Sequence, residues 1–268
     1  MKLTINKLDI SFKDQGQEQS QAHPTLVFLH YWGGSSRTWN AVIDALPARF
    51  RTVAPDLRGW GDSEAAQDLS AYALSDFSSD ILGLIKALAL ESYILVGHSM
   101  GGKIAQLIAS QRPEGLAGLV LVAPSPPTPL EMPDEARSVM RSAYANAESV
   151  GMALDHMLTG KPLSPEHRQQ AIEDSLRGAP EAVAAWPNST SYEDISAEVG
   201  KINVPTLVIA GELDKVDPVA VLQTQVLPRI PQSSLHILPA TGHLSPFESP
   251  TEIADVITAF ADGLSSNA

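Results

Sequence analysis

Short apolar segments recur along the chain, and they limit its possible folds more than any other feature. Each segment is too short for a helix, is rich in branched side chains and is apolar on both faces. A strand with two apolar faces has to be covered by helices on both sides, which is typical of a parallel sheet. The segments are residues 25–29, 52–54, 93–96, 119–122 and 206–210.

Helical patterns fill the stretches between these segments. Apolar residues recur at the spacing of one helix face within residues 77–88, 104–108 and 253–260. Strands that alternate with helices imply right-handed crossovers and a sheet covered on both faces. Residues 1–12 instead alternate between polar and apolar, which predicts an antiparallel hairpin at the sheet edge. The sequence therefore predicts an α/β fold with a mostly parallel, doubly wound sheet.

The alternation stops between residues 124 and 201. This stretch opens with a proline cluster at 124–129, which can continue neither a helix nor a central strand. Ser164 followed by Pro165 is typical of a helix start. A purely helical stretch between two strands of one sheet is expected to lie over the strand ends as a lid. Its predicted helices are residues 133–147, 149–158, 164–177 and 180–186. We expect a core of residues 1–123 and 202–268 and an inserted helical lid of residues 124–201.

The composition excludes several classes of function. The 268 residues include no cysteine, so disulfides, thiolate metal sites and a thiol nucleophile are excluded. Aspartate and glutamate number 31 against 18 lysines and arginines, and the formal charge of −13 disfavours binding to nucleic acid or anionic lipid. No apolar stretch approaches the roughly 20 residues of a membrane span, and residues 1–12 do not resemble a signal peptide. We expect a cytoplasmic protein with no nucleic-acid partner and no membrane partner. The sequence sets no oligomeric state.

A candidate nucleophile lies in residues 97–101, which read Gly-His-Ser-Met-Gly and match the pattern G-x-S-x-G. The pattern follows a predicted strand and precedes a predicted helix, the context in which it forms a tight strand-to-helix turn. The flanking glycines let two backbones approach. The turn raises the serine hydroxyl above the sheet edge at a helix N-terminus, where negative charge is favoured. Ser99 is therefore the predicted nucleophile.

With this turn in this context, the chain resembles the α/β-hydrolase family along nearly its whole length. It looks most like the compact, lid-bearing serine esterases that carry the sequence GHSMGG, here residues 97–102. The resemblance implies an oxyanion hole of two backbone N–H groups, one from Trp32 in the loop after residues 25–29 and one from Met100. Tyr31 stands where the family usually has glycine. The rings of Tyr31 and Trp32 are also candidates for an aromatic wall.

The resemblance also assigns an acid, because the family order is serine, acid, histidine. After the predicted strand at 206–210 the chain reads Gly-Glu-Leu-Asp-Lys-Val-Asp-Pro, and the family pattern Gly-x-x-Asp selects Asp214. Three other carboxylates compete for this role: Glu212, Asp217 and Glu248. Asp217 precedes a proline and is expected to cap the next helix instead.

His243 is the implied base. It follows a glycine in the loop after the predicted strand at 235–238, the place where the family carries its histidine. In this role it takes the proton of Ser99 and returns it to the leaving group, while Asp214 fixes its tautomer. Four other histidines are interpreted as surface or packing residues: His23, His156, His167 and His236. For His156, a place in the predicted lid facing the pocket is an alternative.

The predicted lid is rich in methionine and other large apolar side chains, which suits an apolar acyl or alcohol group. Tyr31, Met157 and Trp186 are the candidate substrate-binding residues, although most lid side chains are expected to form lid core. The histidines lack the spacing of a metal site, so no metal is expected. No cofactor is expected either.

The resemblance implies a carboxylesterase-like enzyme whose partner is a small-molecule ester or related acyl substrate. The favoured reaction is hydrolysis of small to medium hydrophobic carboxylic esters or lactones through an acyl-enzyme on Ser99. The same triad serves hydrolases of carbon–carbon bonds in ring-cleavage products, and also perhydrolases, and both remain alternatives. Some relatives of the fold only bind ligands. The complete set of serine, aspartate and histidine disfavours that third alternative.

Overall fold

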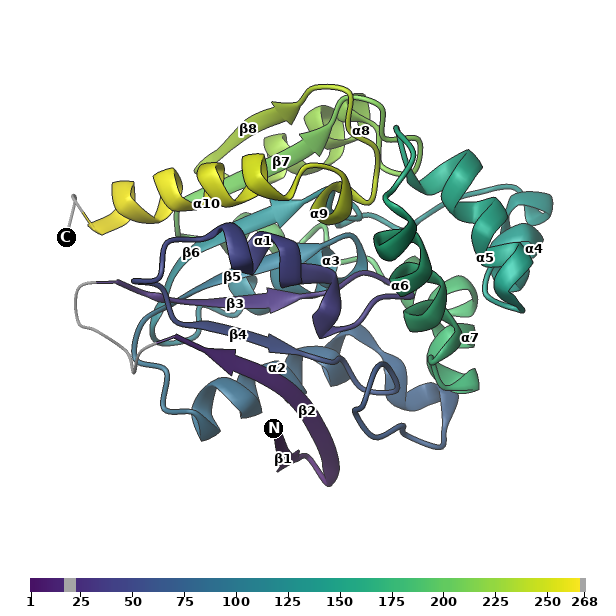
Figure 1. The fold of residues 1–268 in the computed structure, drawn as a ribbon. Helices are drawn as coiled ribbons and strands as arrows, with labels where there is room; N and C mark the ends of the chain where they lie inside the picture. Colours follow the sequence, from purple (N-terminus) through teal and green to yellow (C-terminus); the bar gives the residue numbers. More distant parts are fainter. Residues whose placement is uncertain (17–22, 266–268) are drawn as a thin grey trace.

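The fold is built on one eight-stranded sheet with the order β1-β2-β4-β3-β5-β6-β7-β8. The computed structural model describes residues 1–16 and 23–265. β1 and β2 form an antiparallel hairpin at one edge, and β2 is also antiparallel to β4. All the other neighbouring strands are parallel. The predicted α/β fold, with its mostly parallel sheet and its edge hairpin, is confirmed (Figure 1).

The elements follow the predicted segments closely. The strands are β1 Lys2–Ile5, β2 Leu8–Gln15, β3 Thr25–Leu29, β4 Thr52–Pro55, β5 Tyr93–His98, β6 Leu116–Val122, β7 Thr206–Gly211 and β8 Ser233–Leu238. The α-helices are α1 Asn40–Ala45, α2 Leu74–Ala87, α3 Met100–Ser110, α4 Asp134–Ser142, α5 Ala147–Ala153, α6 Pro165–Leu176, α7 Pro180–Asn188, α8 Val219–Val221, α9 Ser245–Glu248 and α10 Pro250–Ser265.

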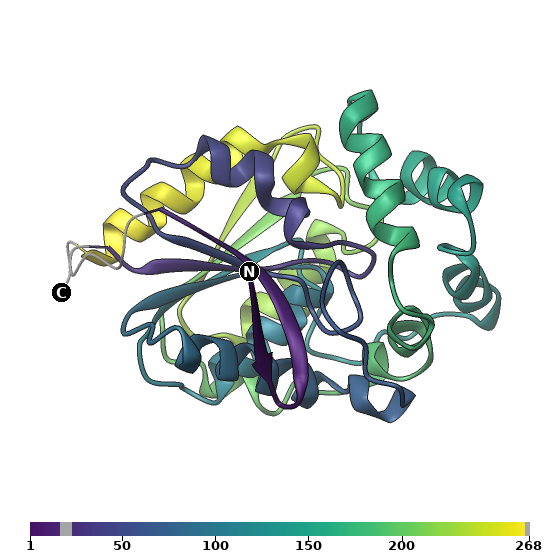
Figure 2. The same cartoon turned by 60° about the horizontal axis from the view of Figure 1, so that its bottom comes forward.

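Alternate residues of the central strands enter two separate apolar cores. Val27 and Leu29 of β3 face the core that contains the apolar faces of α2 and α3. Leu26 and Phe28 face the opposite core, which contains residues of α1 and α10. Figure 2 shows α1 and α10 together on one side of the sheet and α2 on the other. Both faces are thus covered, and this explains why the sequences of the central strands are apolar throughout.

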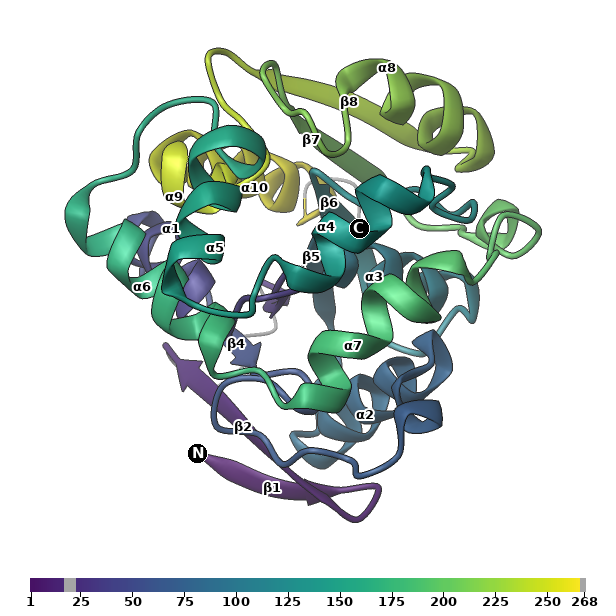
Figure 3. The ribbon, with the colours of Figure 1, turned by 90° about the vertical axis from the view of Figure 1, so that its right-hand side faces the viewer.

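Helices α4 to α7 all lie between β6 and β7 in the chain, and we call residues 124–201 the helical insertion. They gather beyond the carboxyl ends of the parallel strands (Figures 1 and 3). Ser164 caps α6 through a bond from the N–H of His167 at 3.1 Å, and Pro165 is its first residue, as the sequence predicts. α4 is shorter than predicted and ends at Ser142, and a single π-helical turn, Leu154–Leu158, follows α5.

None of the helices in residues 1–16 and 23–265 combines the length and the apolar character that a membrane-spanning helix needs.

Candidate active site

Ser99 occupies the sharp turn between β5 and α3. Its backbone has φ 53° and ψ −115°, a strained combination for a residue with a side chain, which costs on the order of 1–3 kcal/mol. The turn depends on its glycines: a Cβ at Gly97 would lie 2.4 Å from the carbonyl oxygen of Gly101. A Cβ at Gly101 would lie 2.5 Å from the carbonyl oxygen of Leu29. The turn therefore packs directly against the end of β3, as the sequence pattern predicts.

The structure brings Ser99, His243 and Asp214 together from three separate loops. Nε2 of His243 lies 2.9 Å from Oγ of Ser99, and Nδ1 of His243 lies 2.9 Å from Oδ2 of Asp214. The other carboxylate oxygen, Oδ1, accepts the backbone N–H groups of Val216 at 2.8 Å and Asp217 at 3.0 Å. The three side chains form one continuous chain of hydrogen bonds, the arrangement that activates a serine hydroxyl.

The electrostatics of this chain of bonds favour proton transfer to the ring. Burial disfavours the charged form of His243, but the charge and hydrogen bond of Asp214, together with the charges of Asp217 and Glu248, hold the pKa of His243 above its ordinary value. Burial likewise opposes ionisation of Asp214. The charge and hydrogen bond of His243, with two backbone N–H groups, still hold the pKa of Asp214 below its ordinary value. The ring can thus accept a proton while Asp214 stays ionised.

The loop after β3 carries the two aromatic residues Tyr31 and Trp32. Leu57 donates its N–H to Nε2 of His30 at 3.0 Å, so the ring proton lies on Nδ1, which donates to the carbonyl oxygen of Tyr31 at 2.8 Å. Burial lowers the pKa of His30 and keeps this ring neutral. The N–H of Gly34 reaches the same carbonyl oxygen at 3.0 Å. The peptide that links Tyr31 to Trp32 is therefore held in one orientation, and its N–H belongs to Trp32.

Met100 is the first residue of α3 and directly follows Ser99. The first N–H groups of a helix have no partner within the helix, so they are available to an anion above the turn. The carbonyl oxygen of Ser99 accepts a hydrogen bond from the N–H of Lys103 at 3.1 Å. The N–H of Ser99 donates to the carbonyl oxygen of Val122, also at 3.1 Å. These bonds hold the backbone of the turn rigid on both sides of the nucleophile position.

Residues 24–250 match the family model of the alpha/beta hydrolase fold. This chain belongs to the α/β-hydrolase family. It is 30% identical to an sn-1-specific diacylglycerol lipase of Mus musculus over 253 residues, covering 88% of this chain and 80% of the lipase. It is 28% identical to the pimeloyl-[acyl-carrier protein] methyl ester esterase of Aeromonas hydrophila over 249 residues, covering 88% of this chain and 95% of that esterase. The solved structure of an esterase from Exiguobacterium antarcticum has the same fold, with a TM-score of 0.86, 21% identity and coverage of 97% of this chain and 98% of that one.

The candidate pocket residues of this hydrolase differ in exposure. Tyr31 is 2% exposed, and its ring lies against that of His98 with centroids 5.2 Å apart. Trp186 of α7 is 5% exposed and belongs to the apolar core. Met157, in contrast, is 48% exposed on the helical insertion. A role for these side chains in binding substrate stays a prediction.

Asp217 does not cap a helix, and that prediction is wrong. Pro218 occupies the N-cap position of α8, and no side-chain hydrogen bond caps this helix. Asp217 is instead 2% exposed and lies among the charged groups of the site. Burial raises the pKa of its carboxyl to about 8, and the charge of Asp214 adds to this while that of His243 opposes it.

Glu248 is a competitor for the acid role in the sequence, but in this hydrolase its carboxylate binds backbone N–H groups. Its Oε2 accepts three backbone N–H groups: Gly160 at 2.9 Å, Lys161 at 3.2 Å and Gly242 at 3.0 Å. It therefore ties the helical insertion to the loop that carries His243. The signal in the sequence was the glutamate five residues after His243, but the sequence does not identify the N–H groups that it binds.

His98, beside the nucleophile position, supports the backbone of His243. Its Nε2 donates to the carbonyl oxygen of His243 at 2.8 Å. Burial and the charge of His243 lower the pKa of His98 to about 3, so this ring stays neutral. Within residues 1–16 and 23–265, no group of three or more histidine, aspartate or glutamate side chains is arranged to hold a metal ion.

Proposed function

We propose that this hydrolase cleaves small to medium hydrophobic carboxylic esters or lactones through an acyl-enzyme on Ser99. The observation that carries the proposal is the pair of 2.9 Å contacts of His243, one to Ser99 and one to Asp214. Similar proteins that act on esters support the choice of substrate class: one is a diacylglycerol lipase and another is a methyl ester esterase.

In the proposed mechanism, Oγ of Ser99 attacks the ester carbonyl carbon while Nε2 of His243 takes the hydroxyl proton. The carbonyl oxygen becomes an oxyanion, which accepts the backbone N–H groups of Trp32 and Met100. The imidazolium then gives its proton to the departing alkoxide, and the acyl group remains on Ser99. Water enters by the same route: His243 removes its proton, hydroxide attacks the acyl carbon, and collapse returns the proton to Ser99.

The helical insertion acts in this proposal as the lid, and residues 1–123 and 202–268 as the core. Ser99 is only 8% exposed beneath it, so the insertion limits what reaches the nucleophile. Tyr31, Trp186 and Met157 are the proposed walls of the acyl or alcohol pocket. A dry, apolar pocket strengthens each hydrogen bond to the oxyanion.

The test is labelling by a fluorophosphonate followed by intact-protein and peptide mass spectrometry. We expect one phosphonate on Ser99, and none on Ser99→Ala. For a p-nitrophenyl ester series, Ser99→Ala is expected to lower kcat by on the order of 10⁴ or more without a lower melting temperature. Phosphonate on another residue would overturn the assignment of the nucleophile. Cleavage of vinylogous diketones by a wild-type protein inert toward every ester and lactone would replace the ester assignment with carbon–carbon bond hydrolysis.

A further inference from the structure

The loop after β3 receives hydrogen bonds from the helical insertion as well as from the core. Tyr144, between α4 and α5, donates its hydroxyl to the carbonyl oxygen of Trp32 at 2.7 Å. Ser175, near the end of α6, donates its hydroxyl to the carbonyl oxygen of Gly33 at 3.0 Å. Both bonds are buried. Two consecutive carbonyl groups of the proposed oxyanion loop thus depend on side chains of the insertion.

The contact of Tyr144 is also shaped by packing. Its ring lies on the indole of Trp32, with centroids 4.2 Å apart and an angle of 31° between the planes. A Cβ at Gly33 would lie 2.5 Å from the atoms of the Tyr144 ring. Gly33 also has φ 96°, a conformation that glycine adopts without strain. The loop at this point has room for Tyr144 only because residue 33 is glycine.

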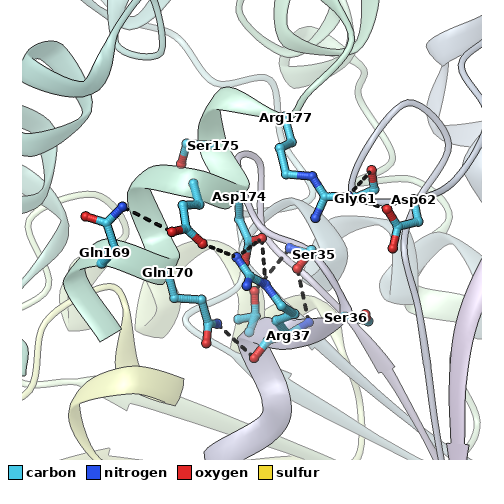
Figure 4. A network of polar contacts seen from close by, with 12 residues as sticks. Ser35, Ser36, Arg37, Gly61, Asp62, Gln169, Gln170, Asp174, Ser175 and Arg177 are labelled. Carbon is cyan, nitrogen blue, oxygen red and sulfur yellow. Dashed lines mark hydrogen bonds and ion pairs between the residues drawn. The ribbon is translucent and has the colours of Figure 1, made fainter. Parts of the chain in front are cut away.

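The position of Ser175 is fixed by hydrogen bonds between its neighbours on α6 and Arg37 (Figure 4). Asp174 is almost fully buried, and its Oδ1 accepts Nε and Nη2 of Arg37 at 3.0 and 2.8 Å. Gln170, one turn earlier, donates to the carbonyl oxygen of Arg37 at 3.0 Å. A hydrogen-bonded pair of charges with one buried partner fixes geometry closely. α6 is therefore attached just beyond the loop that Ser175 contacts.

We infer that Tyr144 and Ser175 are positioning residues that set the geometry of the oxyanion hole, so that docking of the helical insertion completes the active site. This inference rests on the proposed function, which assigns the N–H of Trp32 to the oxyanion. His30 fixes the peptide plane before the Cα of Trp32, and Tyr144 fixes the plane after it. The N–H of Trp32 lies in the first plane, and because peptide units are planar, fixing the second plane restrains rotation at the Cα of Trp32 that would otherwise tilt the first.

The insertion is needed for this geometry because the carbonyl groups of Trp32 and Gly33 lose their hydrogen-bond donors, Tyr144 and Ser175, when it undocks. A buried polar group without a hydrogen bond costs about 1–3 kcal/mol, so the carbonyls of Trp32 and Gly33 would turn toward water. Turning the Trp32 carbonyl would rotate the backbone at the Cα of Trp32 and displace the peptide that carries its N–H. A misplacement of about 1 Å at a reacting centre can cost up to ~100-fold in rate.

The test compares Tyr144→Phe, which keeps the ring and removes the hydroxyl, with Tyr192→Phe. Tyr192 is a matched control because it also lies in the insertion but is 39% exposed, with its ring against Arg137. We expect Tyr144→Phe to lower kcat for a p-nitrophenyl ester about tenfold, with KM within about twofold of wild type. The inhibition constant of a trifluoromethyl ketone, which forms a tetrahedral adduct, should rise by the same factor. Tyr192→Phe should leave all three values unchanged. An unchanged kcat, or a raised KM alone, would overturn the inference.

Ser175→Ala repeats the test at the next carbonyl, with the exposed Ser142→Ala on α4 as its control. If Tyr144→Phe fails to fold, Ser175→Ala tests the positioning role by itself. Hydrogen–deuterium exchange of the peptide spanning residues 31–36 should be faster in both test variants and unchanged in both controls. Hydrogen–deuterium exchange reports on this loop whether or not the protein cleaves an ester. A wild-type protein without phosphonate on Ser99 would therefore refute the proposed function, whereas unchanged exchange would refute the positioning role alone.

Discussion

Replacing Asp214 with asparagine tests the assignment of the acid most sharply, because the structure determines how the new amide must turn. Oδ1 of Asp214 accepts two backbone N–H groups, from Val216 and Asp217. An amide NH₂ cannot face these donors, so the amide oxygen has to take that position. The NH₂ group then points at Nδ1 of His243, which lies 2.9 Å from Oδ2 in the native protein.

This orientation forces the histidine into the wrong tautomer. Nδ1 has to accept from the amide, so the ring proton moves to Nε2, which faces Ser99 and can no longer take the serine proton. A wrong tautomer of this kind costs ~10⁴-fold in kcat in serine proteases. That factor corresponds to about 5 kcal/mol of transition-state stabilisation. The overall fold should survive, since the amide keeps both backbone hydrogen bonds.

Asp217→Asn is the matched control, three residues away in the same loop. No described hydrogen bond joins its carboxylate to His243, so we expect kcat/KM within about tenfold of wild type. Both variants are to be assayed with one short p-nitrophenyl ester, and their thermal melts compared with wild type. If Asp217→Asn lost activity while Asp214→Asn retained it, the assignment of the acid would be refuted.

Three further predictions follow from the site. Asp214 raises the pKa of His243, and only the neutral ring accepts a proton. We therefore expect kcat/KM to rise with pH through an apparent pKa above the ordinary ~6.5 of histidine. A rise centred below that value would contradict the predicted effect of Asp214. Burial raises the pKa of Asp217 from the ordinary 3.8 to about 8 in the folded protein. The stability that its protonated form contributes is therefore lost as pH rises between these values, at no more than about 1.4 kcal/mol per pH unit. Asp217→Asn should therefore gain melting temperature relative to wild type between pH 5 and 8, and parallel pH profiles of the two proteins would show that the carboxyl does not titrate there. Trp186→Ala and Met157→Ala should each shift the preferred acyl chain length of the ester series, because both side chains are proposed walls of the pocket. An unchanged preference in both variants would show that these side chains face away from the pocket.

The sheet could be predicted because burial on both faces leaves a direct mark on the sequence. Residues 25–29 are apolar throughout, and they match β3 from end to end. The triad side chains could be placed together because each follows a strand of one parallel sheet, and the carboxyl ends of such strands meet at one edge. The order of the three residues in the chain and the turn residues around them are enough to predict that they meet. No long-range contact has to be known.

The contacts of the helical insertion could not be predicted in this way. Tyr144 and Gly33 are 111 positions apart, and nothing in either local sequence says that a ring will lie on that glycine. Asp217 was misread for a related reason. A carboxylate before a proline is typical of a helix cap, but here the proline itself occupies the N-cap position and Asp217 is buried.

The helical insertion joins two neighbouring strands of the sheet, since β6 pairs directly with β7 in a parallel arrangement. A segment between two such strands can be exchanged for a longer, shorter or unrelated one without moving the sheet, provided that it still runs from the end of β6 to the start of β7. In this protein, however, such an exchange would also remove the hydroxyl groups that hold Trp32 and Gly33. A transplanted insertion would bring a new pocket, yet it would give a slow enzyme unless it also supplied donors to those two carbonyls. Under the positioning role proposed for Tyr144 and Ser175, a change of substrate range made by exchanging the insertion is therefore tied to a change in the rate of the chemistry itself.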